Sequence, residues 1–204
     1  MAAWAKACAV AGILVAIHAG HAVYADEKTH RYKAGDDIAL WTNKVGPYNN
    51  PQETYNYNSL PLCHADNANV AQRKFGSLGN VLMGNELIKS KIHHIKFLEE
   101  ISKTPYCAKE MKEDDLELLY NAILEQYWFE MYIDDLPLWG FVGKVETTGQ
   151  EQSIWMYTHQ KFTIGYKEDR ILYVRLTMME PHELLGKNDA SGGGPLKMSF
   201  TYEV

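Results

Sequence analysis

The chain lacks most of the features by which membrane-embedded, nucleic-acid-binding and catalytic proteins are recognised from sequence. After residue 25, no apolar stretch approaches the length of about 20 residues that a membrane helix needs. Lysine and arginine number 20 against 26 acidic residues, and the basic residues are not clustered, which argues against nucleic acid or an anionic membrane surface as a partner. The metalloprotease pattern HExxH, the hydrolase pattern GxSxG and a phosphate-binding P-loop are all absent. No Asn-x-Ser/Thr glycosylation site is present either.

The first 25 residues have the pattern of a secretory signal. A single early lysine, Lys6, precedes an apolar run over residues 7–17 that is too short to span a membrane. Val23 and Ala25 have the spacing of a cleavage site, so we expect cleavage between Ala25 and Asp26. The alternative is a buried N-terminal helix.

Cysteine is scarce, with three in the whole chain, and Cys8 lies in the expected signal. Cys63 and Cys107 remain, an even number in a chain predicted to enter an oxidising compartment. We therefore predict that they form a disulfide, which would close a loop of roughly 44 residues and contribute about 4 kcal/mol in the chain-entropy model. Two buried thiols are the alternative, and the spacing excludes a CxxC metal or redox site.

Apolar periodicity predicts one helix, over residues 115–127. Its apolar positions recur three or four residues apart along one face, and Asp114 with Glu117 has the spacing of a capping box. The predicted apolar stripe consists of Leu116, Leu119, Tyr120, Ile123, Leu124 and Tyr127.

Alternating or β-branched segments predict strands elsewhere. Two come before the helix, at residues 37–45 and 92–98, and six follow it, at residues 128–133, 138–145, 154–158, 162–166, 171–177 and 198–204. Residues 46–63 and 77–90 are predicted loops, the second with a short strand. We expect a mainly β (α+β), β-sandwich-like domain over residues 26–186 with one inserted amphipathic helix. A flexible Gly-rich linker at 187–195 and a final strand at 196–204 would follow.

The stretch YIDDLPLWGFVG contains the only arrangement that suggests acid–base chemistry. Asp134 and Asp135 are neighbours, so in a strand their side chains would point to opposite faces and share no proton. With Pro137 close behind, the interpretation that we prefer is a turn. Gly140 and Gly143 would then permit a bulge or a close approach of strands.

The remaining candidates are scattered. The histidines show no metal-ligand spacing, because the adjacent pair His93 and His94 would diverge on a strand. The aromatic residues of this region either stack on a ligand or fill a sandwich core, and the pattern favours the core. They are Trp128, Phe129, Tyr132 and Trp139. We predict no catalytic, cofactor-binding or metal-ligating residue.

Several ordered blocks of sequence resemble the luminal N-terminal domain of the nonaspanins, the nine-transmembrane superfamily of Golgi and endosomal proteins. These blocks are NKVGPYNNPQETYNY (43–57), LPLC (60–63), SLGNVLMGNEL (77–87), YWFEMYIDDLPLWGFVG (127–143), HQKFTIGYKEDRIL (159–172) and the final MSFTYEV. The resemblance implies a domain without known reaction chemistry, in which Asp134, Asp135, Pro137, Trp139, Gly140 and Gly143 are structural. It also implies a role in sorting membrane-protein cargo through the Golgi and endosomes.

Nonaspanins continue beyond this last strand into a bundle of membrane helices, whereas the sequence stops at Val204. We therefore expect membrane attachment only through helices that this chain does not contain, and a luminal or secreted protein without them. The alternative function is a secreted, non-catalytic module that binds sugar or peptide through the Tyr/Trp-rich surface near residues 48–57. Exposure of Trp128 and Trp139 to solvent would favour it. The sequence assigns neither cargo nor oligomeric state.

Overall fold

Alternating apolar and polar residues form long strands in the structure, a computed structural model that describes residues 30–63, 72–74, 79, 82, 84–149, 151–184 and 196–204. The elements before the helix are β1 (Asp37–Ile38), β2 (Leu40–Pro47), β3 (Tyr55–Asn56), the 3-10 helix η2 (Tyr57–Ser59), β4 (Arg73–Lys74), β5 (Leu87–Lys89), β6 (Ile95–Lys96) and β7 (Thr104–Met111). Then come the helix α3 (Glu113–Leu124), β8 (Tyr127–Ile133), β9 (Leu136–Phe141), β10 (Gly143–Thr148), β11 (Glu151–Lys167), β12 (Arg170–Leu184) and β13 (Leu196–Glu203).

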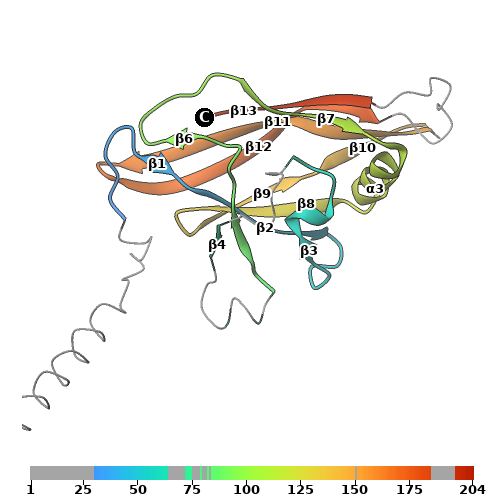
Figure 1. The fold of residues 1–204 in the computed structure, drawn as a ribbon. Helices are drawn as coiled ribbons and strands as arrows, with labels where there is room; N and C mark the ends of the chain where they lie inside the picture. Colours follow the sequence, from blue (N-terminus) through green and yellow to red (C-terminus); the bar gives the residue numbers. More distant parts are fainter. Residues whose placement is uncertain are drawn as a thin grey trace, which may run out of the picture. The chain divides into compact units, whose positions relative to one another are not determined.

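These strands form two main sheets that face each other (Figure 1). The first sheet has the order β4-β5-β2-β8-β9, with β3 also paired to β2. The second has the order β10-β11-β13-β7, and β12 pairs along β11. β1 and β6 form a separate two-stranded sheet. The predicted fold class, mainly β with a single helix in the described part of the chain, is confirmed.

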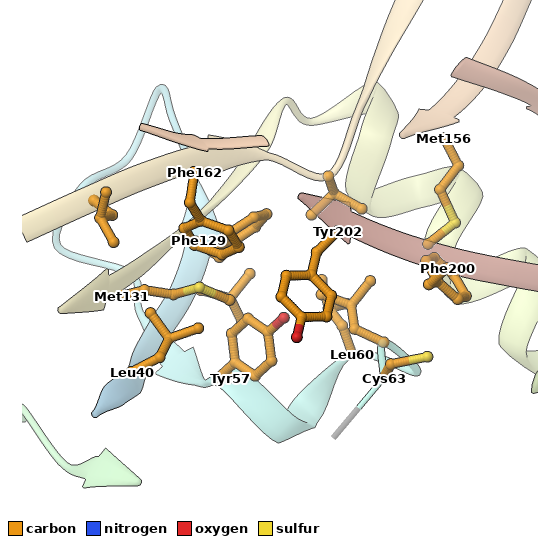
Figure 2. Close-up of a cluster of buried hydrophobic side chains, with 14 of the residues drawn as sticks. Leu40, Tyr57, Leu60, Cys63, Phe129, Met131, Met156, Phe162, Phe200 and Tyr202 are labelled. Atoms are coloured by element: carbon orange, nitrogen blue, oxygen red, sulfur yellow. The ribbon is translucent and has the colours of Figure 1, made fainter. Parts of the chain in front are cut away.

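The inward faces of both sheets contribute to one core (Figure 2). The first sheet supplies Leu40, Val45, Phe129, Met131, Ile133 and Leu138, and the second supplies Ile154, Met156, Phe162, Met198, Phe200 and Tyr202. Each side chain of this size stabilises the fold by about 1.5–3 kcal/mol when it is fully buried. This shared core makes the arrangement a sandwich.

The chain passes from the first sheet to the second at Val142. β9 pairs with β8 and ends at Phe141, whereas β10 starts at Gly143 and pairs with β11. Buried Val142 bonds to both sheets, because its N–H donates to Tyr127 O at 3.0 Å and its carbonyl accepts from the Tyr157 N–H at 3.1 Å. The single strand predicted over 138–145 is therefore wrong, since periodicity does not show that a strand changes partner at a corner.

The helix α3 lies against the second sheet beside this corner. It starts two residues before the predicted residue 115, with three acidic residues in a first turn whose helix dipole favours negative charge. The Lys112 N–H donates to the Asp115 carboxylate at 3.2 Å, so the predicted Asp114–Glu117 cap is wrong. The helix α3 stops at Leu124 because Gln126 adopts a left-handed backbone conformation with φ of 54°.

The predicted apolar stripe of the helix is partly correct. Leu119 and Ile123 are buried, and Leu116 and Tyr120 are partly buried against the core. The other two predicted members differ: Leu124 is 39% exposed, and Tyr127 belongs to β8.

Several other strands also differ from their predicted boundaries. The predicted strand 37–45 divides into β1 and β2, which belong to different sheets, and only Ile95–Lys96 of 92–98 is a strand. Residues 154–158 and 162–166 are parts of the single strand β11, and β7 was not predicted. The apolar alternation of β7 is weak because it is an edge strand in which only Met111 is buried.

Some sequence predictions lie outside the described residues. They are the signal over 1–25 with its cleavage site at Ala25 and Asp26, the linker 187–195, and parts of the loop 77–90. Within the described ranges, no helix has the length and hydropathy needed to cross a membrane.

The burial of α3 predicts that Ile123→Asp abolishes folding or secretion. Ile123 is 1% exposed, and an unpaired buried carboxylate costs several kcal/mol, comparable to the stability of a whole domain. Leu118→Asp, on the same helix at a position 45% exposed, is the matched control and should be secreted at the wild-type level. Equal secretion of both variants, measured by immunoblot of the medium, would show that the packing of α3 is not required.

Candidate functional site

Asp134 and Asp135 form the two-residue turn between β8 and β9. Both have a positive φ, of 52° and 64°, which is the conformation of a type I′ hairpin turn and one that aspartate tolerates. Asp134 Oδ1 accepts a hydrogen bond from the Tyr32 hydroxyl at 3.1 Å, and Asp135 Oδ1 lies 3.5 Å from Lys74 Nζ. The turn agrees with the sequence prediction, and both carboxylates contact residues distant in sequence.

The other residues of this motif shape the strand β9 and the corner after it. Pro137 lies inside β9 opposite Tyr132. Gly140 leaves room for Phe129, because a Cβ at Gly140 would lie 2.6 Å from its ring. A Cβ at Gly143 would lie 2.1 Å from Trp155 O, so the predicted close approach of strands is present at Gly143, whereas the near neighbours of Gly140 are the side chains of Phe129 and Met178.

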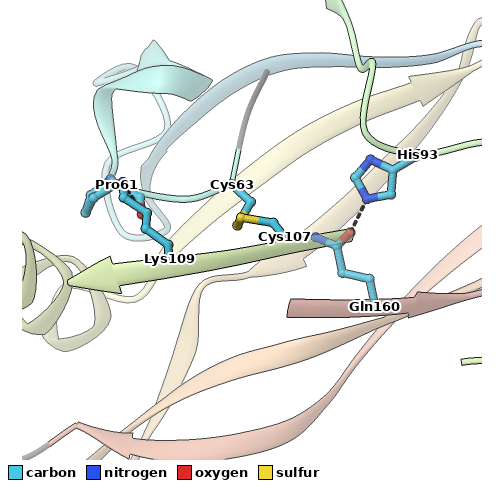
Figure 3. Close-up of a disulfide and its surroundings, with 6 residues drawn as sticks. All are labelled: Pro61, Cys63, His93, Cys107, Lys109 and Gln160. Carbon is cyan, nitrogen blue, oxygen red and sulfur yellow. Dashed lines mark hydrogen bonds between the residues drawn. A yellow bond between two sulfur atoms is a disulfide. The ribbon is translucent and has the colours of Figure 1, made fainter. Parts of the chain in front are cut away.

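The predicted disulfide is present between Cys63 and Cys107 (Figure 3). Their Cα atoms are 6.2 Å apart, within the range that a disulfide spans. The bond joins the segment after η2 to the edge strand β7. Lys109 Nζ donates to Pro61 O at 3.1 Å beside it. The disulfide and this hydrogen bond therefore hold the same two segments together.

His93 is buried beside β7 and precedes β6, so it does not lie on the strand predicted over 92–98. Its Nε2–H donates to Gln160 Oε1 at 3.0 Å, as Figure 3 shows, and its Nδ1 accepts from the Ser90 hydroxyl at 2.8 Å. The ring also packs between aromatic rings, with Tyr106 at 4.5 Å and Tyr202 at 5.2 Å between centroids. Burial lowers the pKa of His93 from 6.5 to about 4, although the hydrogen bond to Gln160 opposes the shift. In the described ranges, no three His, Cys, Asp or Glu side chains are grouped as metal ligands.

Outward-facing aromatic side chains border a groove of about 660 Å³ on the first sheet. We call it the aromatic groove, and it is lined by Tyr48, Asn49, Pro51, Trp128, Trp139, Gly140 and Phe141. Trp139 is 55% exposed, Phe141 42% and Tyr48 60%. Trp128 lies opposite Phe141 in the β8–β9 register, and the Tyr48 and Phe141 rings are 5.7 Å apart. Exposed aromatic side chains from β9 and from the loop after β2 therefore share one surface.

The groove changes the interpretation of the aromatic residues. The core prediction holds for Phe129, which is 2% exposed, but not for Trp139. The Tyr-rich surface predicted near residues 48–57 is only partly present, because Tyr57 is buried and packs edge-on against Phe129 at 5.7 Å. Sequence reasoning missed Phe141, although its alternation with Trp139 in β9 was a usable signal.

A buried carboxylate, Glu130, lies beside the groove opposite Trp139 in the register of β8 and β9. Glu130 Oε2 accepts from Asn43 Nδ2 at 2.7 Å and lies 3.8 Å from Lys44 Nζ. The Tyr132 hydroxyl donates to Glu130 Oε1 at 3.1 Å, and burial together with the Glu130 charge raises the pKa of Tyr132 to about 12. Both carboxylate oxygens are therefore engaged within the protein, by Asn43, Lys44 and Tyr132.

The segments that form the groove are acidic. Residues 45–63 and 113–143 contain no lysine, arginine or histidine. Exposed Glu53 accepts from Asn50 Nδ2 at 3.0 Å in the loop that lines the groove, and exposed Glu125 precedes Gln126, whose carbonyl accepts from the Tyr48 N–H at 3.2 Å. Burial and then the charges of Glu125 and Glu53 raise the pKa of Tyr127. Among the described residues, no basic side chain is within ion-pair distance of Glu53 or Glu125, so the negative charge at this end of the groove is not neutralised by a salt bridge from the described part of the chain.

The turn geometry predicts different outcomes for two substitutions of Asp134. Asp134→Asn keeps an acceptor for Tyr32 and tolerates the left-handed backbone, so it should change the free energy of unfolding by no more than roughly 1 kcal/mol. Asp134→Val places a β-branched residue at positive φ and should destabilise by roughly 1–3 kcal/mol. Urea denaturation measures both, and a valine variant as stable as the asparagine variant would contradict the turn assignment.

Burial of neutral His93 predicts a pH-dependent stability. The unfolded chain binds the proton below the ordinary pKa of 6.5, whereas the folded chain does not bind it until about pH 4. The free energy of unfolding is therefore not reduced by His93 above pH 6.5. On acidification from pH 6.5 towards pH 4 it falls, with a contribution from this residue of about 1.4 kcal/mol per pH unit. His93→Gln should flatten this slope relative to the wild type, whereas His182→Gln, at an exposed position, should not. Parallel slopes for all three proteins would show that His93 is not the titrating group.

Comparisons with known proteins place the chain among membrane-protein relatives. The sequence model of the endomembrane protein 70 family matches residues 54–204. Transmembrane 9 superfamily member 3 of Arabidopsis thaliana is 38% identical over 197 residues, which cover 95% of this chain and 32% of the relative. Transmembrane 9 superfamily member 1 of Mus musculus is 38% identical over 207 residues, which cover 98% of this chain and 32% of the relative.

The chain spans about a third of the length of these relatives. No solved structure matches it significantly. The family model covers well over half of the chain, including the turn, the corner and the aromatic residues of β9. The resemblance to the nonaspanins is thereby confirmed, and the chain belongs to the endomembrane protein 70 family, the transmembrane 9 superfamily.

Proposed function

We propose that this chain is the luminal domain of a protein that sorts and localises other membrane proteins through the Golgi and endosomes. The observation that carries this proposal is the family match over residues 54–204, together with relatives named as transmembrane proteins. Its partner would be membrane-protein cargo, and its attachment to the membrane would lie in the part of the relatives that this chain does not match.

The disulfide supports a luminal location. Disulfides form and persist in oxidising compartments such as the secretory lumen and are rare in the cytosol. The Cys63–Cys107 bond closes the segment between η2 and β7, and Cys63 is itself buried in the core. The predicted signal at residues 1–25 would direct the chain to the same side of the membrane.

The role that we propose is non-catalytic. Asp134 and Asp135 are engaged in contacts across the fold with Tyr32 and Lys74, and Glu130 in contacts with Asn43 and Tyr132. His93 is held neutral by burial and bonded through both ring nitrogens. These acid and base groups therefore serve the structure, which supports recognition rather than turnover.

The second candidate function is a secreted, non-catalytic module that binds sugar or peptide. The specific observation that favours it is the aromatic groove, in which Trp139 is 55% exposed. The groove volume of about 660 Å³ is within the range of roughly 300–1,000 Å³ that is usual for ligand sites. A groove of this kind also suits a sorting protein that recognises a luminal segment of its cargo.

Fractionation of cells with an antibody raised against the chain separates the two candidates. The sorting function predicts a protein of the relatives' full length that stays in the membrane pellet after alkaline extraction and sediments with Golgi and endosomal markers. A soluble protein with the size of this chain, recovered from the medium, would instead establish the secreted module.

Loss of the gene provides the functional readout. The sorting function predicts that a subset of membrane proteins moves from its normal compartment when the gene is disrupted, and that the intact gene restores the distribution. Rescue by a Cys63→Ser variant should be weaker, because it removes the disulfide. An unchanged distribution of membrane proteins after disruption would contradict the sorting function.

A further inference from the structure

The two tryptophans of the aromatic groove differ from the other described tryptophans in whether a lysine lies over the ring. Trp41 has Lys74 over its ring at 5.9 Å, and Trp155 has Lys144 over its ring at 5.8 Å. Both distances suit a cation–π contact, which extends to about 6 Å from the ring centroid. Within the described part of the chain, no cation covers Trp128 or Trp139 in this way. The exposed ring of Trp139, with partly exposed Trp128 in the same groove, is thus left uncovered by the lysines and arginines that the structure describes.

The charge around the groove has the sign that would attract a cation. Basic residues are absent from both segments that form it, and Glu53 and Glu125 contribute carboxylates at the Tyr48 end. Both carboxylates belong to segments that meet at Tyr48. The Tyr48 N–H donates to Gln126 O at 3.2 Å, next to Glu125, and Glu53 belongs to the same loop as Pro51. Lys44 is the basic residue nearest to the groove along β2, and it is already engaged with Glu130 and Asn85.

We propose that the aromatic groove binds an extended peptide segment that carries an arginine between apolar residues, supplied by a partner protein. The guanidinium stacks on the exposed ring of Trp139, with Trp128 in the same groove, since arginine stacks on aromatic rings better than lysine does. The apolar neighbours contact Phe141, Tyr48 and Pro51, and the carboxylates of Glu53 and Glu125 attract the segment electrostatically.

The lining favours this ligand over a sugar. The lining side chains offer acceptor atoms only at Asn49 and Tyr48, which leaves stacking and charge as the main attractions. A neutral sugar gains nothing from the acidic charge around the groove, whereas a guanidinium gains from both stacking and charge. The volume of about 660 Å³ exceeds that of a single guanidinium, so neighbouring residues of the peptide also enter. This inference rests on the proposal that the groove is a binding site and names the chemistry of its ligand.

The test is titration of the secreted chain with a short acetylated and amidated peptide that has one arginine between leucine and proline residues. Tryptophan fluorescence and calorimetry report binding. The matched probe carries citrulline in place of arginine, which keeps the planar shape and removes the charge. We expect the citrulline peptide to bind roughly 5- to 30-fold more weakly, and affinity for the arginine peptide to fall as salt is raised.

Protein variants locate the site. Trp139→Ala should weaken binding of the arginine peptide roughly 5- to 30-fold, whereas Leu172→Ala, which removes an equally exposed apolar side chain elsewhere, should not. The double variant Glu53→Gln with Glu125→Gln should reduce both affinity and salt dependence. Glu151→Gln with Glu183→Gln makes the same change of net charge at exposed positions outside the groove and serves as its control. Thermal unfolding confirms that each variant is folded.

Each contrary result would overturn a particular part of this proposal. Equal binding of the arginine and citrulline peptides would overturn recognition of a cation, while leaving the groove as a peptide site. Wild-type affinity in Trp139→Ala would show that the peptide binds elsewhere. Absence of binding by either peptide, or binding of a neutral oligosaccharide in their place, overturns the proposal. None of these results bears on the sorting function, which is decided by fractionation and gene disruption.

Discussion

The close approach of backbones at the corner between β9 and β10 is the constraint on which the rest of the structure depends. Val142 bonds to a strand of each sheet, and the glycines on either side of it lie where a Cβ atom would collide with a neighbour. If the corner were wider, Leu138 and Ile154 would not reach the same core. Ile123 of α3 also packs against Gly143, so the helix position is set by the same close approach.

The corner also explains why the aromatic groove lies on the outside of the sheet. Gly140 must point inward to admit Phe129 and Met178, and alternation along β9 then directs Trp139 and Phe141 outward. Trp139 and Phe141 are thus exposed as a consequence of the inward position of Gly140. The β8–β9 turn fixes the register, so that Trp128 lies beside Phe141 and Glu130 beside Trp139. A structural constraint and a recognition surface therefore share one stretch of chain.

The sequence predicted the parts of this structure that local chemistry determines. The turn at Asp134 and Asp135, the close approach of strands at Gly143, the apolar face of α3 and the cysteine pair each depend on a few neighbouring residues or on a count. Strand partners were not accessible in this way. The chain changes sheets between Phe141 and Gly143 without any break in its apolar pattern, and a pattern of period two is the same for one long strand as for two.

The candidate site was harder still to predict, because an aromatic residue in a strand has the same pattern whether it faces a core or a solvent-exposed groove. Phe129 and Trp139 are both aromatic, yet one is buried and the other is half exposed. Only the pairing partner and the side of the sheet decide between them, and both depend on contacts distant in sequence. His93 illustrates the same limit, since its two hydrogen-bonding partners include Gln160 of a strand far along the chain.

The position of the disulfide along the chain has a consequence for the order of synthesis. Cys63 and Cys107 both precede α3, β8 and every strand of the second sheet except β7. Domains fold from the N-terminal side as the chain emerges at about 5–20 residues per second. The two segments that the disulfide joins therefore leave the ribosome before Phe129 and Phe200, two core residues of later strands. In the oxidising compartment proposed above, this order would let the crosslink form first, as a covalent frame onto which the later strands assemble.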